Sequence, residues 1–459
     1  MESQNILLIT IDSLRQDFLG TTVNGRSISP RIDGLANDGL QFPQAVANGS
    51  NTPSSFPSIL TSTYPLMYGG YRYLDDERPF VAGTFRNAGF ETVAYHSNPH
   101  LGPDMNYDQG FERFNDQGSS DDRSEIGILN RTKNAVEQRI DRDSVLYGVL
   151  RRAWHIFSLT TDTAAYADAE EISESATAWI DERDADRPFF TWLHYMDVHY
   201  PFMPPEEHLE ALNIDPPSKR RIAKLNGLMH EEPDQITDTD REQLLDLYRA
   251  EIHYADAQIG RVLDRLESAK ELENTLVVVT GDHGEAFGEH GRYGHHPFLY
   301  DELLRVPLVM NGPGIEAGKT VDEQVSLVDI GPTLYNLIGI DIPDTVQGES
   351  LVPLIDPDSG KQNERIALST ALGGETLATR TSKWKCFWRV RDEQVELYDL
   401  ENDPEETRDV SEQYPDVVER FKSELESHLE DADATDIDLP DPTVSDEAQG
   451  RLRDLGYVE

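Results

Sequence analysis

Four short polar segments of this 459-residue sequence carry side chains that can bind a metal ion or act as a nucleophile. The most specific is TGDHGE at 280–285, in which Asp282 and His283 follow an apolar run and are flanked by glycines. A carboxylate and an imidazole in adjacent positions can turn toward one cation, because glycines permit backbone geometries that bulkier residues resist. The alternative is a polar turn in which Asp282 caps a helix. This segment alone leaves both interpretations open.

Each of the other three segments adds a candidate. Asp12 directly follows the run NILLITI and is either a second carboxylate ligand or a helix N-cap. Thr52 precedes an expected helix, whose positive end lowers the cost of ionising a hydroxyl, although a structural N-cap is the common fate of such a residue. His194, Asp197 and His199 are grouped after another apolar run. Surface histidines are common, but such a group at one strand end is less so.

The elements that would position these residues alternate along the chain. Continuous apolar runs, typical of strands buried on both faces of a parallel sheet, lie at 5–11, 92–95, 189–193, 276–280 and 306–310. Helical patterns lie between them, at 29–38, 165–182 and 241–269. This alternation predicts an α/β fold with a doubly wound, mostly parallel sheet flanked by helices. Ligands bind beyond the carboxyl ends of such strands, so Asp12 and Asp282 are expected to converge.

The character of the sequence changes near residue 366. We expect a catalytic domain over 1–366 and a small α+β C-terminal subdomain over 367–459. The subdomain is predicted to hold short antiparallel strands at 379–390 and 394–399, a helix at 415–429, and then an acidic tail from 430. The single cysteine, Cys386, falls in this subdomain, which excludes a disulfide framework or a cysteine-based zinc site within one chain.

Two segments, 118–163 and 201–240, carry many charges and no clear strand pattern. They have the character of insertions or lids over a catalytic domain. An amphipathic stretch at 145–159 is expected to pack on the body of the protein, the alternative being contact with a membrane surface or a lipid-like substrate.

The charge of the chain is extreme, with 86 acidic against 40 basic residues and a net charge of −46. A surface of this kind repels phosphate backbones, so nucleic-acid binding by a general basic face is not expected. The acidic residues are spread over the whole length, which favours adaptation to high salt, where screening reduces the repulsion. We find no apolar run of the ~18–20 residues that a membrane span needs, and no signal-peptide pattern in MESQNILLIT. A cytoplasmic location is therefore the expectation.

In their order along the chain, these segments resemble the sulfatase family of the alkaline phosphatase superfamily. The resemblance is carried by NILLITIDSLRQDFLG, SSFPSILTSTYP and, most specifically, VVVTGDHGEAFGEHGRYGHH. It covers nearly the whole chain and is weakest at 118–163 and 201–240. It implies that Asp12, Asp282 and His283 are metal ligands, and that Thr52 stands at the nucleophile position and also touches the metal.

The resemblance also implies roles for three basic residues. His199 matches a histidine that contacts the anionic group of the substrate. His295 matches a basic residue that binds the anion or protonates the leaving group. Arg15 follows the first metal-binding strand and is expected to support the Asp12 carboxylate.

The sequence departs from the family pattern at two places. The sulfatase nucleophile is a cysteine or serine in C/S-x-P-x-R, oxidised to formylglycine. Here the segment is TPSSF, in which Thr52 has no route to that aldehyde and Phe56 replaces the supporting arginine. Ser13 stands where many sulfatases have a second aspartate, which weakens a calcium-type site of many oxygen ligands. A mixed nitrogen and oxygen set favours Mn²⁺ or Zn²⁺ over Ca²⁺ or Mg²⁺. A second metal would need more ligands, for which Asp197 and His199 are candidates.

We therefore expect a metal-dependent, sulfatase-like hydrolase of sulfate or phosphate esters that acts through a Thr52 alkoxide rather than formylglycine. The alternatives are a transferase that moves a phospho-group on glycans or lipids, and a catalytically inactive, anion-binding homologue. The expected partner is a small anionic ester, either free or carried on a glycan or lipid. Hydrolase and transferase share their metal ligands, so these residues do not separate the two.

Overall fold

The computed structural model describes residues 4–116, 167–295, 298–355 and 364–435. The segments 118–163 and 145–159 therefore lie outside the described residues, as does the tail from residue 436. Among the residues described, no helix is both long and apolar enough to cross a membrane.

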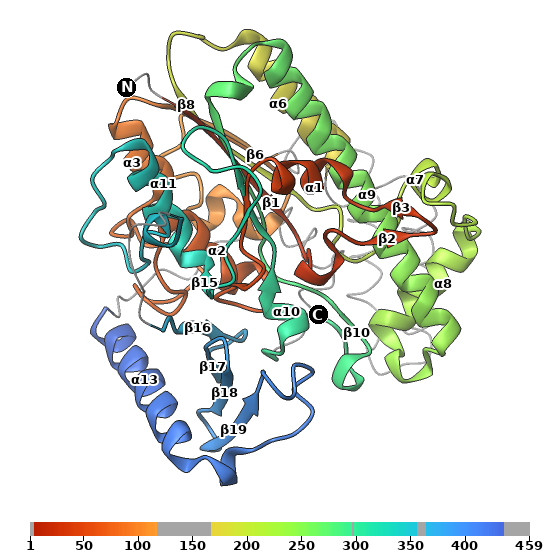
Figure 1. Cartoon of the computed structure of the whole chain (residues 1–459), viewed down its shortest axis with the longest axis vertical. Coiled ribbons are helices and arrows are strands. Elements are labelled where there is room, and N and C mark those ends of the chain that lie inside the picture. The colour runs from red at the N-terminus through yellow and green to blue at the C-terminus, as the bar shows by residue number, and fades with distance from the viewer. Residues whose placement is uncertain (1–3, 117–166, 296–297, 356–363, 436–459) are drawn as a thin grey trace, which may run out of the picture.

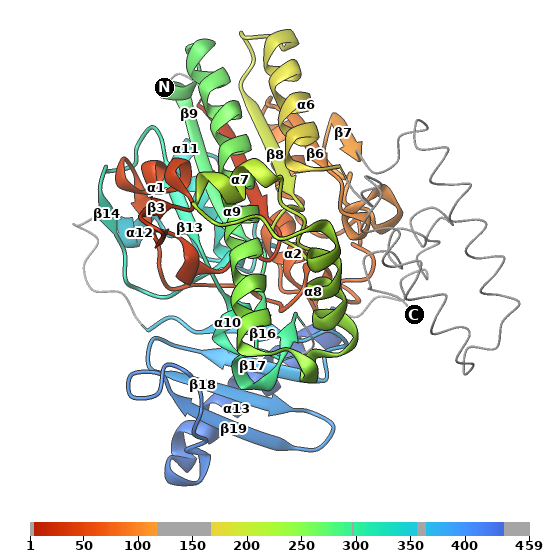
Figure 2. The same ribbon diagram turned by 90° about the vertical axis from the view of Figure 1, so that its right-hand side faces the viewer.

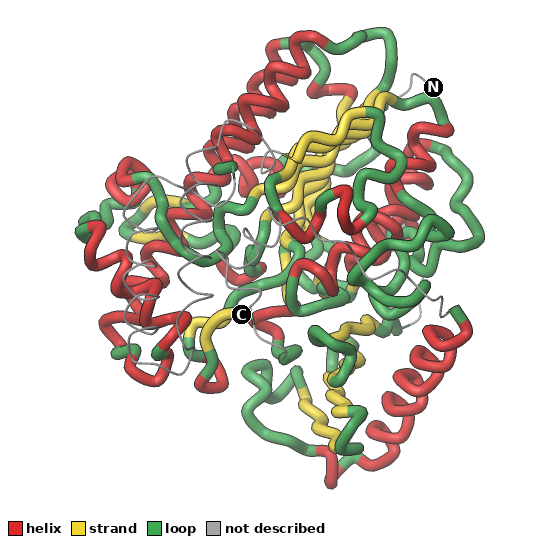
Figure 3. Tube along the Cα trace, turned by 180° about the vertical axis from the view of Figure 1, so that it is seen from behind, coloured by secondary structure: helices red, strands yellow, loops and turns green. Residues whose placement is uncertain are grey.

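An eight-stranded sheet forms the centre of the molecule and confirms the predicted fold class (Figure 3). Five of its strands run parallel, in the order β9 (Thr275–Gly281), β1 (Asn5–Ile11), β8 (Phe189–Tyr195), β6 (Glu91–His96) and β7 (Arg113–Asp116). Beyond β9 the order continues with β13 (Leu308–Asn311), β4 (Leu40–Gln41) and β14 (Lys319–Thr320). Strand β13 is antiparallel to both β9 and β4.

The apolar run predicted as one strand at 306–310 is divided between two sheets. Pro307, which has no N–H to donate to a sheet ladder, separates β12 (Arg305–Val306) from β13. Strand β12 joins β5 (Ala45–Val46) and β15 (Val325–Ser326) in a small three-stranded sheet.

Helices cover both faces of the central sheet, because successive residues of a strand point to opposite faces. On β1, Ile6 and Leu8 face one apolar core, whereas Leu7 and Ile9 face a second. The first core is closed by α2 (Thr52–Thr61), α3 (Val81–Asn87) and α11 (Ile330–Ile338). The second is closed by α1 (Pro30–Asn37), α6 (Ala169–Glu182), α7 (Glu206–Ala211), α8 (Lys219–Glu231) and α9 (Asp238–Ser268). Figure 1 shows α3 and α11 on one side of β1 and β6, and α6 and α9 on the other.

The segment 201–240 is therefore mostly helical, since α7, α8 and the start of α9 lie in it. Short elements complete this part of the chain. They are β2 (Thr22–Val23), β3 (Arg26–Ser27), β10 (Ala286–Phe287), β11 (Tyr293–Gly294), α10 (Asp301–Leu304) and α12 (Val352–Ile355).

The C-terminal part forms an antiparallel sheet of four strands with one helix packed on it (Figure 2). The strands are β16 (Ala367–Thr370), β17 (Thr376–Arg380), β18 (Trp384–Arg389) and β19 (Gln394–Asp399), and the helix is α13 (Pro415–Ala434). The single strand predicted at 379–390 is thus the end of β17, a turn and β18. The first residues of the predicted acidic tail, 430–434, belong to α13. Cys386 is buried beside Leu397 and Phe421 in a small apolar cluster.

A buried ion-pair network joins the C-terminal sheet to the segment around α10. Lys385 of β18 is fully buried and pairs with Asp301 at 2.8 Å and with Glu406 at 2.9 Å. Arg380 of β17 also binds Asp301, at 2.8 Å. The Glu406 side chain in turn accepts the backbone N–H of Asp301 at 2.7 Å. Buried charges of this kind are tolerated only while every partner is present.

We predict that Lys385→Met lowers the free energy of unfolding by about 3–5 kcal/mol, because it leaves the buried Glu406 carboxylate without its cation. The matched control is Lys383→Met, which removes an ion pair between an exposed lysine and the exposed Glu401. Urea unfolding of the two variants measures the difference. Equal stability of the two variants would show that the buried network does not hold the C-terminal sheet in place.

Candidate active site

The carboxyl ends of β1 and β9 bring two aspartates together. The strands are paired so that Ile11 lies opposite Gly281, which sets the following residues, Asp12 and Asp282, beside each other. His283 completes the group, and one ligand atom from each of the three residues lies within 4.8 Å of the others. All three side chains are fully buried. The structure therefore places the three predicted metal ligands around one point.

The donor set fits a divalent cation. Asp282 Oδ1 accepts the backbone N–H groups of Ser13 at 3.1 Å and His283 at 2.8 Å, whereas Oδ2 has no hydrogen-bond partner among the described residues. Burial and the nearby Asp12 carboxylate raise the pKa of Asp282 well above its usual range. An orphaned, buried oxygen next to a second carboxylate is a position where a cation would remove the electrostatic cost.

The orientation of His283 supports the same assignment. Its Nδ1 lies 2.9 Å from the carbonyl oxygen of Gly284, which accepts the Nδ1 hydrogen and leaves Nε2 as the donor of a lone pair. Nε2 lies 3.5 Å from an oxygen of each of Asp12 and Asp282. Burial and the nearby His295 lower the pKa of His283 to about 4, so the imidazole is neutral, as a metal ligand must be.

The glycines around this turn are needed for space. A Cβ atom on Gly281 would lie 2.5 Å from the carbonyl oxygen of Leu14, and one on Gly284 would meet the carbonyl oxygen of Glu302. Any side chain at these positions would therefore push apart the backbone segments that hold Asp282 and His283. The sequence pattern correctly predicts that glycines are needed at this turn. They are needed because the backbone segments approach closely, and not because the chain adopts a left-handed conformation there.

Thr52 is the first residue of α2 and points into the same group. Its Oγ1 lies 3.2 Å from Asp12 Oδ2, which accepts its hydrogen bond, and 3.4 Å from His283 Nε2. Asn51 is the N-cap of this helix and accepts the Ser54 N–H at 3.2 Å. The cap function belongs to Asn51, which leaves the Thr52 hydroxyl at the positive end of the helix. Ser55 Oγ donates to the Asp282 carbonyl at 2.6 Å and fixes the helix against the turn that carries Asp282 and His283.

Phe56, which stands at the position where the family pattern has an arginine, lies beside His194. His194 Nδ1 is hydrogen-bonded to Thr10 at 2.9 Å, and its Nε2 lies 3.6 Å from Asp12 Oδ2. The Phe56 ring packs edge-on against the His194 ring, with centroids 5.0 Å apart. His194 therefore lies close to Asp12, and the volume at position 56 is filled by an apolar ring.

His199 and His295 lie against each other beside the candidate metal ligands. The His199 and His295 ring centroids are 4.8 Å apart, and His295 is also 4.8 Å from the His283 ring. Burial lowers the pKa of His199. Burial has the same tendency for His295, but the Glu285 carboxylate outweighs it and raises the pKa of His295. One imidazole is thus biased toward the neutral form and its neighbour toward the charged form.

The segment that carries His199 is held in a strained shape. Val198 has φ 124°, a conformation that β-branched residues rarely adopt. The Glu251 side chain of α9 accepts the Met203 N–H at 2.5 Å and anchors the end of the segment. Burial together with the Asp168 carboxylate raises the pKa of the Asp197 carboxyl. Within the described residues, neither Asp197 nor His199 belongs to a group able to hold a metal ion.

Sequence reasoning missed two contacts to the site and misplaced a third. Asn98 Nδ2 donates to Asp12 Oδ2 at 3.1 Å, and Asn98 is the second residue after the end of β6, so a polar residue close to a strand end marks it as well. Glu285 Oε2 lies 3.3 Å from His295 Nδ1. The expectation that Arg15 supports Asp12 is wrong. The Arg15 guanidinium instead donates to the Glu285 carbonyl at 2.9 Å and pairs with Glu289 at 2.8 Å.

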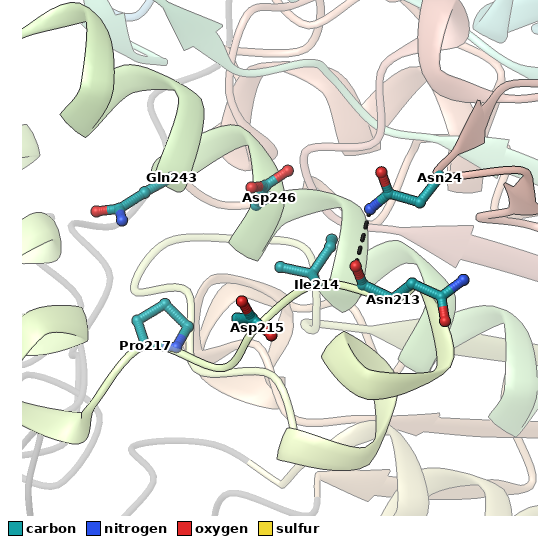
Figure 4. A pocket seen from close by; sticks show the side chains of 7 residues that line it. All are labelled: Asn24, Asn213, Ile214, Asp215, Pro217, Gln243 and Asp246. Atoms are coloured by element: carbon teal, nitrogen blue, oxygen red, sulfur yellow. Dashed lines mark hydrogen bonds between the residues drawn. The ribbon is translucent and has the colours of Figure 1, made fainter.

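A polar hollow of about 310 Å³ lies elsewhere and contains none of these residues. Figure 4 shows its lining side chains, which come from the turn between β2 and β3, from the segment after α7 and from α9. Asn24 and Asn213 are hydrogen-bonded across it at 2.9 Å. This hollow brings no imidazole to its wall, so we place the chemistry at the strand ends.

Comparisons with known proteins show the family of the chain. The model of the sulfatase family matches residues 4–340, and the model of the N-sulphoglucosamine sulphohydrolase C-terminal region matches residues 288–432. The arylsulfatase of Clostridium perfringens is 25% identical over 93% of this chain and 94% of its own length.

Two solved structures share the fold. One, determined with its substrate D-glucosamine-2-N,6-O-disulfate, has a TM-score of 0.70 and 18% identity, and the match covers 96% of this chain and 100% of that one. The other is the phosphonate monoester hydrolase of Agrobacterium radiobacter, with a TM-score of 0.67, 22% identity and coverage of 94% and 96%. Since the sulfatase family model spans well over half of the chain, this protein belongs to the sulfatase family and is an ester hydrolase of that family.

Proposed function

We propose that this enzyme hydrolyses sulfate or phosphate esters with the unmodified Thr52 hydroxyl as its nucleophile, assisted by one divalent metal ion. The observation that carries the proposal is the position of Thr52 Oγ1, 3.2 Å from Asp12 and 3.4 Å from His283. A hydroxyl within reach of two metal ligands at a helix N-terminus can be both deprotonated and aimed.

The donor set supports Mn²⁺ or Zn²⁺, held by Asp12, Asp282 and His283, with Thr52 beside it. When bound, such an ion would lower the pKa of the Thr52 hydroxyl and would stabilise negative charge on an ester oxygen. The Asn98 amide and the His194 imidazole keep the Asp12 carboxylate in place, since both lie against its Oδ2. Among the described residues there is no second group of side chains that could hold another metal ion.

The reaction proceeds in two displacements. The Thr52 hydroxyl gives its proton to the Asp12 carboxylate that accepts its hydrogen bond, and its oxygen attacks sulfur or phosphorus in line, forming a bond to that atom as the bond to the leaving oxygen breaks. His295 gives its proton to the leaving alcohol, and His199 stabilises charge on the non-bridging oxygens. Water then gives a proton to the neutral His295 and attacks the same atom, and the released Thr52 oxygen takes back its proton from Asp12. If another alcohol takes the place of water, the enzyme is a transferase, which product analysis with and without an acceptor alcohol distinguishes.

A glycan is the substrate carrier that we favour over a lipid. The relative solved with a glucosamine disulfate and another solved with a neocarrahexaose are both structures with bound sugars. The absence of an aldehyde-forming residue supports turnover of phospho-esters over sulfate esters, because a direct alkoxide readily attacks phosphorus.

We predict that Thr52→Ala abolishes turnover of para-nitrophenyl phosphate diesters and sulfate, with a loss of several powers of ten, each about 1.4 kcal/mol of barrier. Thr52→Ser should keep part of the activity, because the hydroxyl remains. Ser58→Ala is the control, since Ser58 lies in the same helix and its hydroxyl bonds the Thr63 carbonyl at 3.2 Å. Steady-state kinetics check this, and mass spectrometry should find residue 52 unmodified in the resting enzyme. Strong sulfatase activity that survives Thr52→Ala would move the nucleophile to Ser54 or Ser55.

Metal binding has a readout that does not need a substrate. We predict that Mn²⁺ or Zn²⁺ raises the melting temperature of chelator-treated protein, since ~100 Kd of a ligand adds about 2.7 kcal/mol of stability. Asp282→Asn should lose this shift, yet its metal-free form should be at least as stable as the wild type, because the buried repulsion with Asp12 is relieved. Asp246→Asn, at the polar hollow, should retain the shift. An equal shift in all three proteins would place the bound ion elsewhere.

The net charge of −46 supports the further proposal that the protein is adapted to high salt, as a cytoplasmic protein of a salt-accumulating cell would be. We predict that its melting temperature rises between ~0.1 M and 1 M KCl, because the screening length falls from about 10 Å to 3 Å. Differential scanning calorimetry across this range checks the sign. A melting temperature that falls with added KCl would contradict salt adaptation.

A further inference from the structure

Glu285 is a buried carboxylate of the site to which the mechanism above gives no role. Its side chain is fully buried, and Oε1 has no hydrogen-bond partner among the described residues. Its other oxygen, Oε2, lies 3.3 Å from His295 Nδ1. Burying a carboxylate that has a single side-chain partner is unfavourable in free energy. Proteins keep such unfavourable groups mainly at functional sites.

The backbone of Glu285 is fixed from the opposite side. Arg15 donates to its carbonyl oxygen at 2.9 Å, and the same guanidinium is held by Asp17 at 2.7 Å and Glu289 at 2.8 Å. Arg15 is itself buried, so this anchor is not loosened by solvent. The backbone from which the Glu285 carboxylate extends is therefore fixed in place. The side chain that this carboxylate contacts is His295.

The contact determines which way the His295 ring faces. When a carboxylate accepts the Nδ1 hydrogen of an imidazole, it fixes the tautomer and the ring plane, and Nε2 then lies on the side of the ring away from the carboxylate. The His295 ring lies 4.8 Å from both His283 and His199, so it is held between the candidate metal ligands and the second histidine.

We propose that Glu285 is a positioning residue that orients His295 Nε2 toward the leaving-group oxygen of the ester. This rests on the proposed function, in which His295 gives its proton to the leaving alcohol. The arrangement is a carboxylate–imidazole pair, in which the carboxylate orients the imidazole that transfers the proton.

The test compares esters whose leaving groups need the acid to different extents. A para-nitrophenolate leaves readily without a proton, whereas an unsubstituted phenolate or an alkoxide leaves poorly. General acid catalysis contributes about 10²–10⁴-fold, so Glu285→Leu should slow phenyl esters at least ~10-fold more than para-nitrophenyl esters. The loss should fall on kcat with KM little changed, and Glu285→Gln, which keeps a hydrogen-bond acceptor, should recover part of it.

Glu91→Gln is the matched control. Glu91 is also a buried carboxylate, bound to the Trp179 indole N–H at 3.1 Å, but it lies at the start of β6, the opposite end of the strand from the site. It should leave the ratio of phenyl to para-nitrophenyl turnover unchanged. An equal loss on both leaving groups in Glu285→Leu would overturn the proposal and reduce Glu285 to a structural role.

A measurement without substrate keeps the inference separate from the proposed function. ¹⁵N spectra of the metal-free protein, taken at a pH where His295 is neutral, should show its single hydrogen on Nδ1, and Glu285→Leu should lose this tautomer preference. The doubly protonated ring, with a second hydrogen on Nε2, is the form that donates to the leaving group. His295 with its hydrogen fixed on Nε2 in the wild type would overturn the proposal. Turnover by the wild-type enzyme tests the proposed function, whereas the leaving-group ratio and the tautomer test Glu285, so the two can fail independently.

Discussion

Two buried carboxylates on neighbouring parallel strands are the constraint around which this site is built. The pairing of β1 with β9 places Asp12 beside Asp282 where neither is exposed to solvent. Two like charges in a medium of low dielectric are strongly unfavourable unless one takes up a proton or a cation lies between them. The raised pKa of Asp282 expresses this conflict in the metal-free chain. A divalent ion held between them would resolve it, and its positive charge would then assist attack on the ester.

The remaining site residues either satisfy these carboxylates or depend on their position. Backbone N–H groups hold Asp282 Oδ1, and the Asn98 amide holds Asp12 Oδ2. The first turn of α2 is tied to the carbonyl of Asp282 through Ser55, which fixes the Thr52 hydroxyl relative to both acids. Thr52, the proposed nucleophile, is therefore positioned by the same turn that carries Asp282 and His283, so a shift of this turn moves all three side chains at once.

The sequence predicted the elements that rest on simple periodicity. The runs at 5–11, 189–193 and 276–280 became β1, β8 and β9 almost residue for residue, because strands buried on both faces are continuous apolar runs. The prediction of one strand at 306–310 was wrong, because Pro307 cannot donate a backbone hydrogen bond and divides the apolar run into β12 and β13. The helix at 415–429 was placed too short because exposed acidic residues extend it to Ala434 without adding an apolar signal.

Within the site, predictability depended on whether a residue follows a strand end. Asp12, Asp282 and Asn98 all do, and the topology alone brings them together. The partners of Arg15 could not be predicted from its place in the chain, because Glu285 and Glu289 lie about 270 residues away. They belong to a turn whose direction depends on packing. The Glu285–His295 contact is of the same kind, since it joins two sides of the β10–β11 hairpin that no periodicity reveals.

The central claim is that an unmodified threonine forms the covalent intermediate at a metal-bound site. Peptide mapping of metal-loaded enzyme, quenched in acid during turnover of a phosphate or sulfate ester, tests it directly. We expect the peptide that contains Thr52 to carry one phosphoryl or sulfuryl group, and the corresponding Thr52→Ala peptide to carry none. A label on another residue, or an oxidised residue 52, would contradict the account.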